Sequence, residues 1–504
     1  MWTILSIVAI PVLYYIYTEI KGYFKVQKYI KQGLKHAKYK SLPTLISEMT
    51  KAAKSGDTFH GMKQGISEQD PSQPFSAVNL GSAVLINLIS EKAIKEFYAK
   101  ETDNTLKVQP FKTIPFMGFI FENGAHVQDK RAIFSKVFHY SNILNLMPII
   151  RSQIKLHIKK LKQRVEGEGG ELKIDFKKEF NRALFDDISA CVLLRGANDR
   201  LGDTYEGMNV SQIIQRMIEV LNEAKTNPLF FLPYMANLGL VKQVNEMKCL
   251  KKGLTEIIRS EYNRRYNQED LGDKSVLDIM IKLNKESEKE TGKAKLTIDE
   301  ITSNFELFQI AASDTSFQLS STTLAYLAMP ENIGFQRALR KQVDSELGKR
   351  DSYSNDELNS LSKVDQVFRE AARMANPALS VSRQVSKDFT LDGKTVYKGD
   401  MIINPLIYFE GEYFKDPFKF NPDRFDEKKD GFKRAPKLKQ IPFSVGKRAC
   451  LGKYLGEMVV KLILVEILRE FELSVGDGFV INLDQKPVYG VTNPDLIIKV
   501  RGGE

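Results

Sequence analysis

The chain has 504 residues, 42% of them hydrophobic, and no Gly/Ser-rich linker or repeat divides it after the N-terminus, so one large globular unit is expected. Three cysteines far apart argue against a disulfide framework, and the absence of Cys-x-x-Cys and His-Glu-x-x-His argues against the zinc sites that use them. The net charge of +11 is compatible with nucleic acid, an anionic membrane or an acidic protein partner, but no nucleic-acid fold signature is present.

The N-terminal segment is apolar and is followed by lysines. Residues 1–18 carry no charged side chain, and residues 1–20 reach the ~20 positions that cross a bilayer. We expect a transmembrane anchor at 1–20 and a basic linker at 21–43, with the lysine-rich side and everything after it in the cytoplasm. A cleaved signal peptide would need a basic n-region and an Ala-x-Ala-like site, and both are missing. A re-entrant or interfacial helix stays open as an alternative.

The middle of the chain is helical by pattern. Apolar spacings of three and four predict helices over 142–166 and 211–224. The charged run 284–295 predicts a solvated surface loop. A long helix is expected to begin after Thr297, which has capping-box spacing to Glu300, and no proline interrupts it before residue 330.

The C-terminal part mixes strands with one further helix. Residues 385–391 and 394–403 alternate as strands around a tight Asp392-Gly393 turn. A helix with a core-facing stripe follows Cys450, and residues 473–500 again suggest short strands. The pattern therefore predicts a mainly α fold with small β-sheets.

The ten residues from Phe443 to Gly452 carry the most specific pattern, Phe-x-x-Gly-x-Arg-x-Cys-x-Gly. A cysteine thiolate can ligate a haem iron. Gly446 permits a tight turn beside a flat cofactor, and Arg448 puts a positive charge within reach of a haem propionate. Cys450 would lie at a helix N-terminus, which stabilises an anionic sulfur. A lone cysteine is usually a small buried residue, but the whole pattern resembles the haem-binding signature of the cytochrome P450 family.

This resemblance runs from about residue 40 to the C-terminus and is strongest over 300–475. It implies the cytochrome P450 fold, with haem b (iron protoporphyrin IX) between a long central helix and the Cys-ligand loop. Residues 44–504 would form the haem-thiolate catalytic domain, with Cys450 as the metal ligand. The residues implied to bind the cofactor are Phe443, Gly446, Arg448, Gly452, Arg383, Arg131 and Ala311.

The predicted long helix carries three polar residues, Ser313, Asp314 and Thr315, in an apolar stretch. Alone they indicate a Ser/Thr back-bonding kink. Together with Cys450 they resemble the family's oxygen-binding motif, which implies that Thr315 delivers protons and Asp314 relays them from solvent. Ala312 stands where the family usually has glycine.

The pair Glu370 and Arg373 has the i,i+3 spacing of one helix face, a spacing that at least four other Glu/Arg pairs share. The run 420–425 resembles the family's Pro-x-Arg-Phe element. The resemblance therefore implies a buried triad of Glu370, Arg373 and Arg424 that locks the loop before Cys450.

The family often places a tryptophan four residues before the position of Arg131. This chain has Val127 there, with His126 beside it as a candidate substitute for the missing propionate contact. The substrate pocket is expected near 106–123, 308–316, 378–382 and 489–492. Phe111, Phe116 and Phe119 would line it or belong to the core.

The activity that the resemblance implies is insertion of one oxygen atom of O2 into a small, largely apolar substrate at the endoplasmic reticulum membrane. Electrons would come from an NADPH-dependent flavin reductase, with cytochrome b5 as a further candidate partner. A basic docking face is expected from Lys428, Lys429, Lys433, Arg434, Lys437, Lys439, Lys447 and Lys453.

Two alternatives stay open. A haem-thiolate isomerase or a peroxide-dependent enzyme would need no reductase, but such enzymes often lack an acid–alcohol pair such as Asp314 and Thr315. A non-enzymatic haem sensor or a haem-free membrane scaffold is the other alternative.

Overall fold

The computed structural model describes residues 2–502 except 42, 45–46, 49–50, 52–55, 81–82, 108–117, 177–178, 180–204, 209, 226–237, 269–274, 412, 430–431, 433–434, 486–487 and 494. Side chains are described from residue 13 onward, except those of residues 80, 211, 222 and 225. The expected positions Phe111, Phe116, Lys433 and Arg434 therefore lie outside the described residues.

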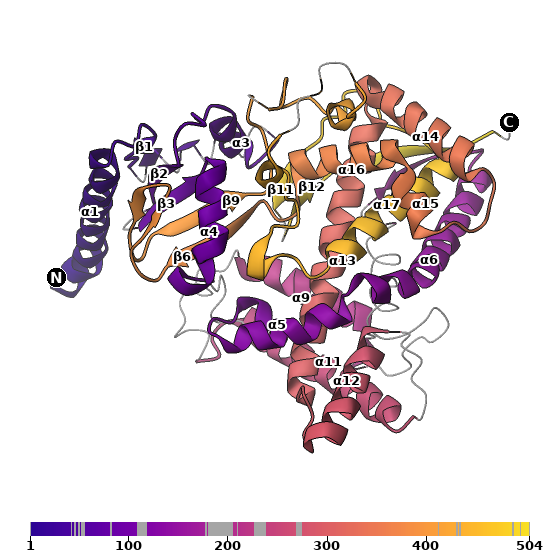
Figure 1. Cartoon of the computed structure of the whole chain (residues 1–504), viewed down its shortest axis with the longest axis horizontal. Coiled ribbons are helices and arrows are strands. Elements are labelled where there is room, and N and C mark those ends of the chain that lie inside the picture. The colour runs from indigo at the N-terminus through magenta and orange to yellow at the C-terminus, as the bar shows by residue number, and fades with distance from the viewer. Residues whose placement is uncertain are drawn as a thin grey trace.

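Helices dominate the described chain, as the sequence predicted, and most of them lie in the right-hand part of Figure 1, whereas α1 lies at the far left. They are α1 (Trp2–Lys31), α3 (His60–Ser67), α4 (Glu91–Asn104), α5 (His126–Val137), α6 (Tyr140–Gly167), α9 (Val210–Lys225), α11 (Lys242–Tyr266), α12 (Val276–Thr291), α13 (Ile298–Ala328), α14 (Ile333–Leu347), α15 (Asn355–Ser360), α16 (Ser362–Ala375) and α17 (Lys453–Glu470). The predicted helices 142–166 and 211–224 correspond to α6 and α9.

The strands form one larger and three small sheets. The six-stranded sheet has the order β1 (Ala37–Lys38), β2 (Phe75–Leu80), β3 (Ala83–Leu88), β9 (Met401–Pro405), β6 (Ser380–Val385) and β4 (Thr105–Leu106). A three-stranded sheet joins β10 (Phe471–Ser474), β13 (Asp495–Val500) and β5 (Glu171–Asp175). The two hairpins are β11 (Leu483–Gln485) with β12 (Tyr489–Val491), and β7 (Phe389–Leu391) with β8 (Lys394–Val396).

The predicted long helix is α13, a rod of 31 residues and about 46 Å that crosses the helical part (Figure 1). Thr297 and Glu300 form the predicted capping box, and the helix ends before Pro330. α13 packs against α16, α17 and α11, and most of its residues are buried. The predicted stripe of the helix after Cys450 is also buried, because α17 lies between α13 and α6.

The loop prediction for 284–295 was wrong in its first part, because α12 continues to Thr291. Lysine and glutamate are good helix formers, and the preceding turns bury Met280, Ile281 and Asn284. Gly292 then ends the helix in the left-handed conformation, with φ of 75°. The run of charged residues therefore indicated an exposed helix surface here and not a loop.

The predicted turn at Asp392-Gly393 is present, with φ of 47° and 75°, as expected for a two-residue hairpin turn. The strands are shorter than predicted. Val385 belongs to β6 and residues 401–405 to β9, and these two strands pair in the larger sheet.

Two hydrophobic cores meet at the loop before α17, which contains Cys450. One fills the helical part, and the other lies between the six-stranded sheet, α4 and the C-terminal half of α1. The cysteine loop before α17 contributes Phe443 to the first core and Val445 to the second, so it lies where the two cores join.

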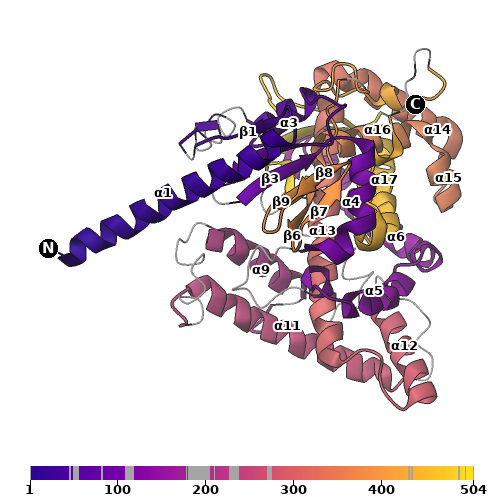
Figure 2. The same cartoon turned by 60° about the vertical axis from the view of Figure 1, so that its left-hand side comes forward.

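α1 runs without interruption from Trp2 to Lys31 and leads away from the body of the molecule (Figure 2). It includes the predicted anchor and the first part of the predicted linker, in which Val26 and Tyr29 are fully buried. The side chains of residues 1–12, on which most of the predicted anchor falls, are not among those described. Across the described residues, no helix joins sufficient length to sufficient apolar character to pass through a bilayer.

Candidate functional site

The loop before α17 folds tightly around Cys450. The Cys450 amide donates to the Phe443 carbonyl at 2.9 Å, and the Ala449 amide donates to the Gly446 carbonyl at 3.2 Å. Gly446 has φ of 79°, a backbone conformation that favours glycine, whereas a Cβ there would make only an ordinary contact with Tyr98. Cys450 ends up three residues before the first turn of α17, close to the predicted position.

The Cys450 side chain is exposed, although it lies deep within the protein. It therefore faces an open interior space and not packed atoms. Burial raises the pKa of the Cys450 thiol, while the Gly452 amide, Arg131 and Lys107 act in the opposite direction. A metal ion at the sulfur would add the charge that favours the thiolate.

A second open point lies in the middle of α13. Ala311 is exposed and Thr315, one turn later, is half-buried, whereas Phe308, Ser313 and Asp314 are buried. The Thr315 hydroxyl donates to the Ala311 carbonyl at 2.6 Å, which is the back-bond that the sequence alone suggested. An apolar helix face that is exposed inside the protein can receive a flat ligand.

Positive side chains line a pocket next to the cysteine loop. Arg383 and Arg448 lie there with Lys107 and Glu101, and Arg383 pairs with the buried Glu101 at 2.9 Å. Burial, together with Arg383, Arg448 and Arg131, lowers the pKa of Lys107 to about 7. This cluster of like charges is costly without a further anion.

The sequence interpretation missed Lys107. It lies outside every motif, and only the fold brings it to Arg383 and Arg448. Arg131, which was predicted, reaches the same region from α5 and donates a hydrogen bond to the Ala449 carbonyl.

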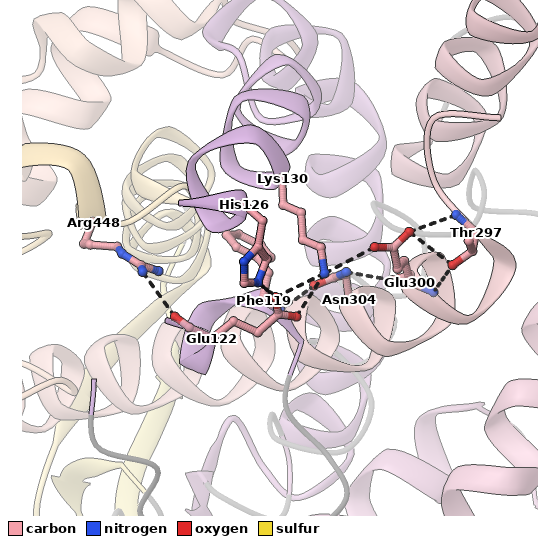
Figure 3. Close-up of polar contacts among 8 residues, drawn as sticks. All are labelled: Phe119, Glu122, His126, Lys130, Thr297, Glu300, Asn304 and Arg448. Atoms are coloured by element: carbon pink, nitrogen blue, oxygen red, sulfur yellow. Dashed lines mark hydrogen bonds and ion pairs between the residues drawn. The ribbon is translucent and has the colours of Figure 1, made fainter. Parts of the chain in front are cut away.

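The Arg448 guanidinium shows which group is missing. Its Nη2 donates to the Glu122 carbonyl at 3.1 Å (Figure 3), whereas Nη1 is buried and has no partner in the described part of the chain. A buried donor without an acceptor is costly, and a carboxylate such as a haem propionate would satisfy it. The exposed thiol, the apolar face at Ala311 and the cationic pocket together fit a flat, dianionic, metal-bearing group such as haem.

Glu122 links this pocket to the start of α13. Its carboxylate contacts His126 at 2.9 Å and Lys130 at 3.1 Å, and Lys130 reaches Glu300 of the capping box at 3.2 Å (Figure 3). His126, the candidate substitute for the missing tryptophan, thus lies against Glu122, and Val127 is fully buried.

The predicted triad is assembled in the structure. Arg373 contacts Glu370 through two nitrogens at 2.8 and 2.9 Å, and Arg424 contacts the same carboxylate at 2.9 Å. Arg373 also donates to the Tyr408 carbonyl at 2.6 Å, so the triad holds the segment that leads toward the cysteine loop.

Two of the expected pocket residues, Phe119 and Tyr489, belong to the hydrophobic core. Phe119 is buried, stacks on Phe134 at 5.0 Å and meets Phe308 edge-on at 6.3 Å, so it belongs to the core beside α13. Tyr489 is fully buried and donates to Asp57 at 2.6 Å.

Lys439 was expected on a basic docking face, and this prediction was wrong. Its side chain is buried and pairs with Glu410 at 2.9 Å, since the chain turns inward at residues 437–439. Among the described members of that set, Lys428, Lys429, Lys437, Lys447 and Lys453 are exposed.

Comparison with known proteins gives consistent results. A sequence model described as Cytochrome P450 matches residues 60–500. Cytochrome P450 709B3 of Arabidopsis thaliana is 28% identical over 344 residues, which are 66% of this chain and 62% of that protein. Cytochrome P450 72A15 of the same plant is 23% identical over 411 residues, which are 79% and 76% of the two chains. The solved structure of retinoic acid-bound cyanobacterial CYP120A1 has a TM-score of 0.68 at 18% identity and covers 90% of this chain and 96% of that chain, which shows the shared fold.

Proposed function

The chain belongs to the cytochrome P450 family, and we propose that it hydroxylates a small, largely apolar substrate with electrons from an NADPH-dependent flavin reductase. As a family member it is a haem-thiolate monooxygenase, and its cofactor is haem b. The observation that carries the proposal is Cys450, whose side chain is free and exposed and lies within the electrostatic reach of Arg131 and Lys107.

Several side chains of the described site would hold the haem. The chemistry that the haem supplies when bound is activation of O2 and transfer of one oxygen atom. Cys450 would ligate the iron, and Arg448, Arg383, Arg131 and Lys107 would hold the propionates by charge-assisted hydrogen bonds. This arrangement would relieve the unpaired Arg448 nitrogen.

Proton delivery would fall to Thr315 and Asp314. The Thr315 hydroxyl donates its hydrogen bond to the Ala311 carbonyl, so its oxygen can still accept a hydrogen bond from another donor. Rotation of the Thr315 side chain breaks that one bond and turns the hydroxyl toward the open space. Asp314 directly precedes Thr315 on α13 and is mostly buried, and it would relay protons from solvent to Thr315.

The wall next to the site supports an apolar substrate. Phe308 lies one turn before Ala311 on α13 and packs edge-on against Phe138 at 4.8 Å and Phe134 at 5.2 Å. Aromatic and alanine surface offers no hydrogen bond to a polar ligand, so apolar groups are favoured there.

Electrons would arrive at the lysine-rich face around the cysteine loop. Lys447 and Lys453 flank Cys450 in sequence and are exposed, as is Lys437. Such a face suits an acidic flavin reductase, or cytochrome b5 as a second donor. The N-terminal segment would hold the enzyme at the endoplasmic reticulum membrane, with the catalytic domain in the cytoplasm.

The test compares two cysteine variants, because Cys249 on α11 is a second free, exposed cysteine. Cys450→Ser should abolish the red-shifted absorption band of the reduced, carbonylated protein and reductase-supported turnover, and Cys249→Ser should preserve both. If Cys450→Ser kept the band, the proposed ligand would be wrong. If the band were present but turnover did not require reductase, the peroxide-dependent or isomerase alternative would replace the monooxygenase proposal.

A further inference from the structure

The N-terminal part of α1 protrudes from the molecule (Figure 2), and many of its described side chains are exposed and apolar. Leu13, Tyr14 and Phe24 are 63%, 66% and 63% exposed, and Ile16, Tyr17, Ile20 and Tyr23 are also exposed. Large contiguous apolar surfaces on soluble proteins mark interaction sites.

The distribution of these residues around the helix identifies the partner. Residues 13–17 are all exposed, and with about 3.6 residues per turn they go completely round α1. A protein groove covers one face of a helix, whereas a lipid layer surrounds it. Tyrosine is favoured at the level of lipid headgroups, and the exposed Lys21, Lys28 and Lys31 suit anionic headgroups.

The other half of α1 is fastened to the catalytic domain. Asp400, which is fully buried, accepts hydrogen bonds from Lys25 Nζ at 2.7 Å, from the Tyr29 hydroxyl at 2.7 Å and from the Val84 amide at 3.1 Å. Burial and the Asp400 carboxylate raise the pKa of Tyr29, so its hydroxyl remains a donor. One carboxylate thus joins two turns of α1 to β3 of the larger sheet.

The residue directly after α1, Gln32, is held by the β7–β8 hairpin. The Gln32 side-chain amide donates to the Thr395 carbonyl at 3.1 Å and accepts from the Thr395 amide at 2.7 Å. Tyr29 also packs edge-on against Tyr397 at 5.4 Å. Residues 25 and 29 lie one turn apart on the same face of α1, and residue 32 follows its end, so the attachment covers the last turns of the helix and the residue after it.

Gly22 lies between the protruding part of α1 and the attached part, and it is bridged from both sides. Tyr39 contacts Glu19 on the N-terminal side of Gly22 through its hydroxyl. It also packs edge-on against Tyr23 on the C-terminal side at 5.6 Å. α1 is therefore braced across its weakest point.

We infer that α1 is a rigid strut: the exposed apolar side chains between residues 13 and 24 lie in a lipid surface, and the contacts of Asp400, Gln32 and Tyr39 fix the tilt and height of the catalytic domain above it. This inference rests on the proposed membrane location. The domain would then be held at one orientation and would not swing on a tether.

The lipid contact is tested with tryptophan fluorescence in the full-length holoenzyme. Trp2→Phe removes the only tryptophan of the chain. In that background, Tyr17→Trp or Phe24→Trp should be quenched by brominated lipids in phosphatidylcholine/phosphatidylserine vesicles. Leu156→Trp, at an exposed position on α6, should not be quenched. Absence of quenching at both α1 positions would overturn the lipid contact, and so would a blue-shifted emission without vesicles, which would indicate a second copy of the chain as the partner.

Rigidity is tested with spin labels on the exposed native Cys249 and on Ile16→Cys, in a Cys191→Ser background. The distance distribution on vesicles should be narrow. A short glycine insertion after Gly22 should broaden it at least about twofold, and Asp400→Asn should broaden it as well. A broad distribution in the parent protein, or an unchanged one after the insertion, would overturn the strut. An unchanged distribution in Asp400→Asn would overturn the role of Asp400. Neither measurement depends on turnover, so failure of the proposed activity would be seen separately in the carbonyl spectrum.

Discussion

Glu306 on α13 is a buried acid with a single distant ion pair among the described residues. Its side chain is 1% exposed, and neither carboxylate oxygen has a hydrogen-bond partner among the described residues. The nearest cation is Lys251 of α11, whose Nζ lies 3.7 Å away. Burial raises the pKa of Glu306 to about 7, and Lys251 offsets only part of this effect. We predict that Glu306→Gln stabilises the protein at alkaline pH.

The magnitude follows from the pKa shift. The pKa rises from 4.5 to about 7, and each unit corresponds to about 1.4 kcal/mol, which gives roughly 3 kcal/mol. In this interval the folded protein keeps the proton that the unfolded chain has lost. The free energy of unfolding therefore falls as pH rises from about 4.5 to about 7 and stays lower above it. Glutamine has nearly the same shape and carries no charge, so Glu306→Gln removes this loss.

The assay is urea unfolding of the variant and the parent protein at about pH 5 and about pH 8. The advantage of Glu306→Gln should be small at the lower pH and approach 3 kcal/mol, to order of magnitude, at the higher pH. Glu256→Gln on α11 is the control, because Glu256 is exposed and lies 4.0 Å from Lys252. If Glu306→Gln were destabilised equally at both pH values, Glu306 would be an ionised partner of Lys251 and the reasoning would be refuted.

Two further predictions concern the cysteine loop and its surroundings. Arg373→Ala leaves Glu370 buried with Arg424 alone, which should cost about 3–5 kcal/mol of stability and yield protein without haem. The control Arg350→Ala removes an exposed ion pair with Glu357 and should load haem normally. A fully loaded Arg373→Ala would contradict the prediction. Reductase-supported turnover should fall steeply as ionic strength rises, because exposed charges are screened within about 8–10 Å, while the absorption spectrum of the haem stays the same; turnover that is independent of salt would argue against the lysine face.

The parts of the fold that could be predicted are those in which local signals agree with packing. α13 has a capping box at Thr297, no internal proline and a mostly buried surface, so pattern and structure coincide. The Cys450 loop could be predicted because its glycine is needed locally: Gly446 adopts positive φ, and its carbonyl accepts the Ala449 amide. The boundaries of the 385–403 strands could not, since partners outside the hairpin decide them.

The failures share one physical cause, which is that neighbours in sequence need not be neighbours in space. Lys439 was assigned to a basic surface with the lysines around it, yet its ammonium turns inward to Glu410. Lys107 carried no local signal and joins Arg448 only through the fold. A run of charged residues in the sequence therefore predicts an exposed surface only where the helix or loop that carries it lies at the surface of the fold. The role of a buried cation can be assigned only once the structure shows which groups it contacts. Nη1 of Arg448 has no hydrogen-bond partner among the described residues, which points to a bound carboxylate.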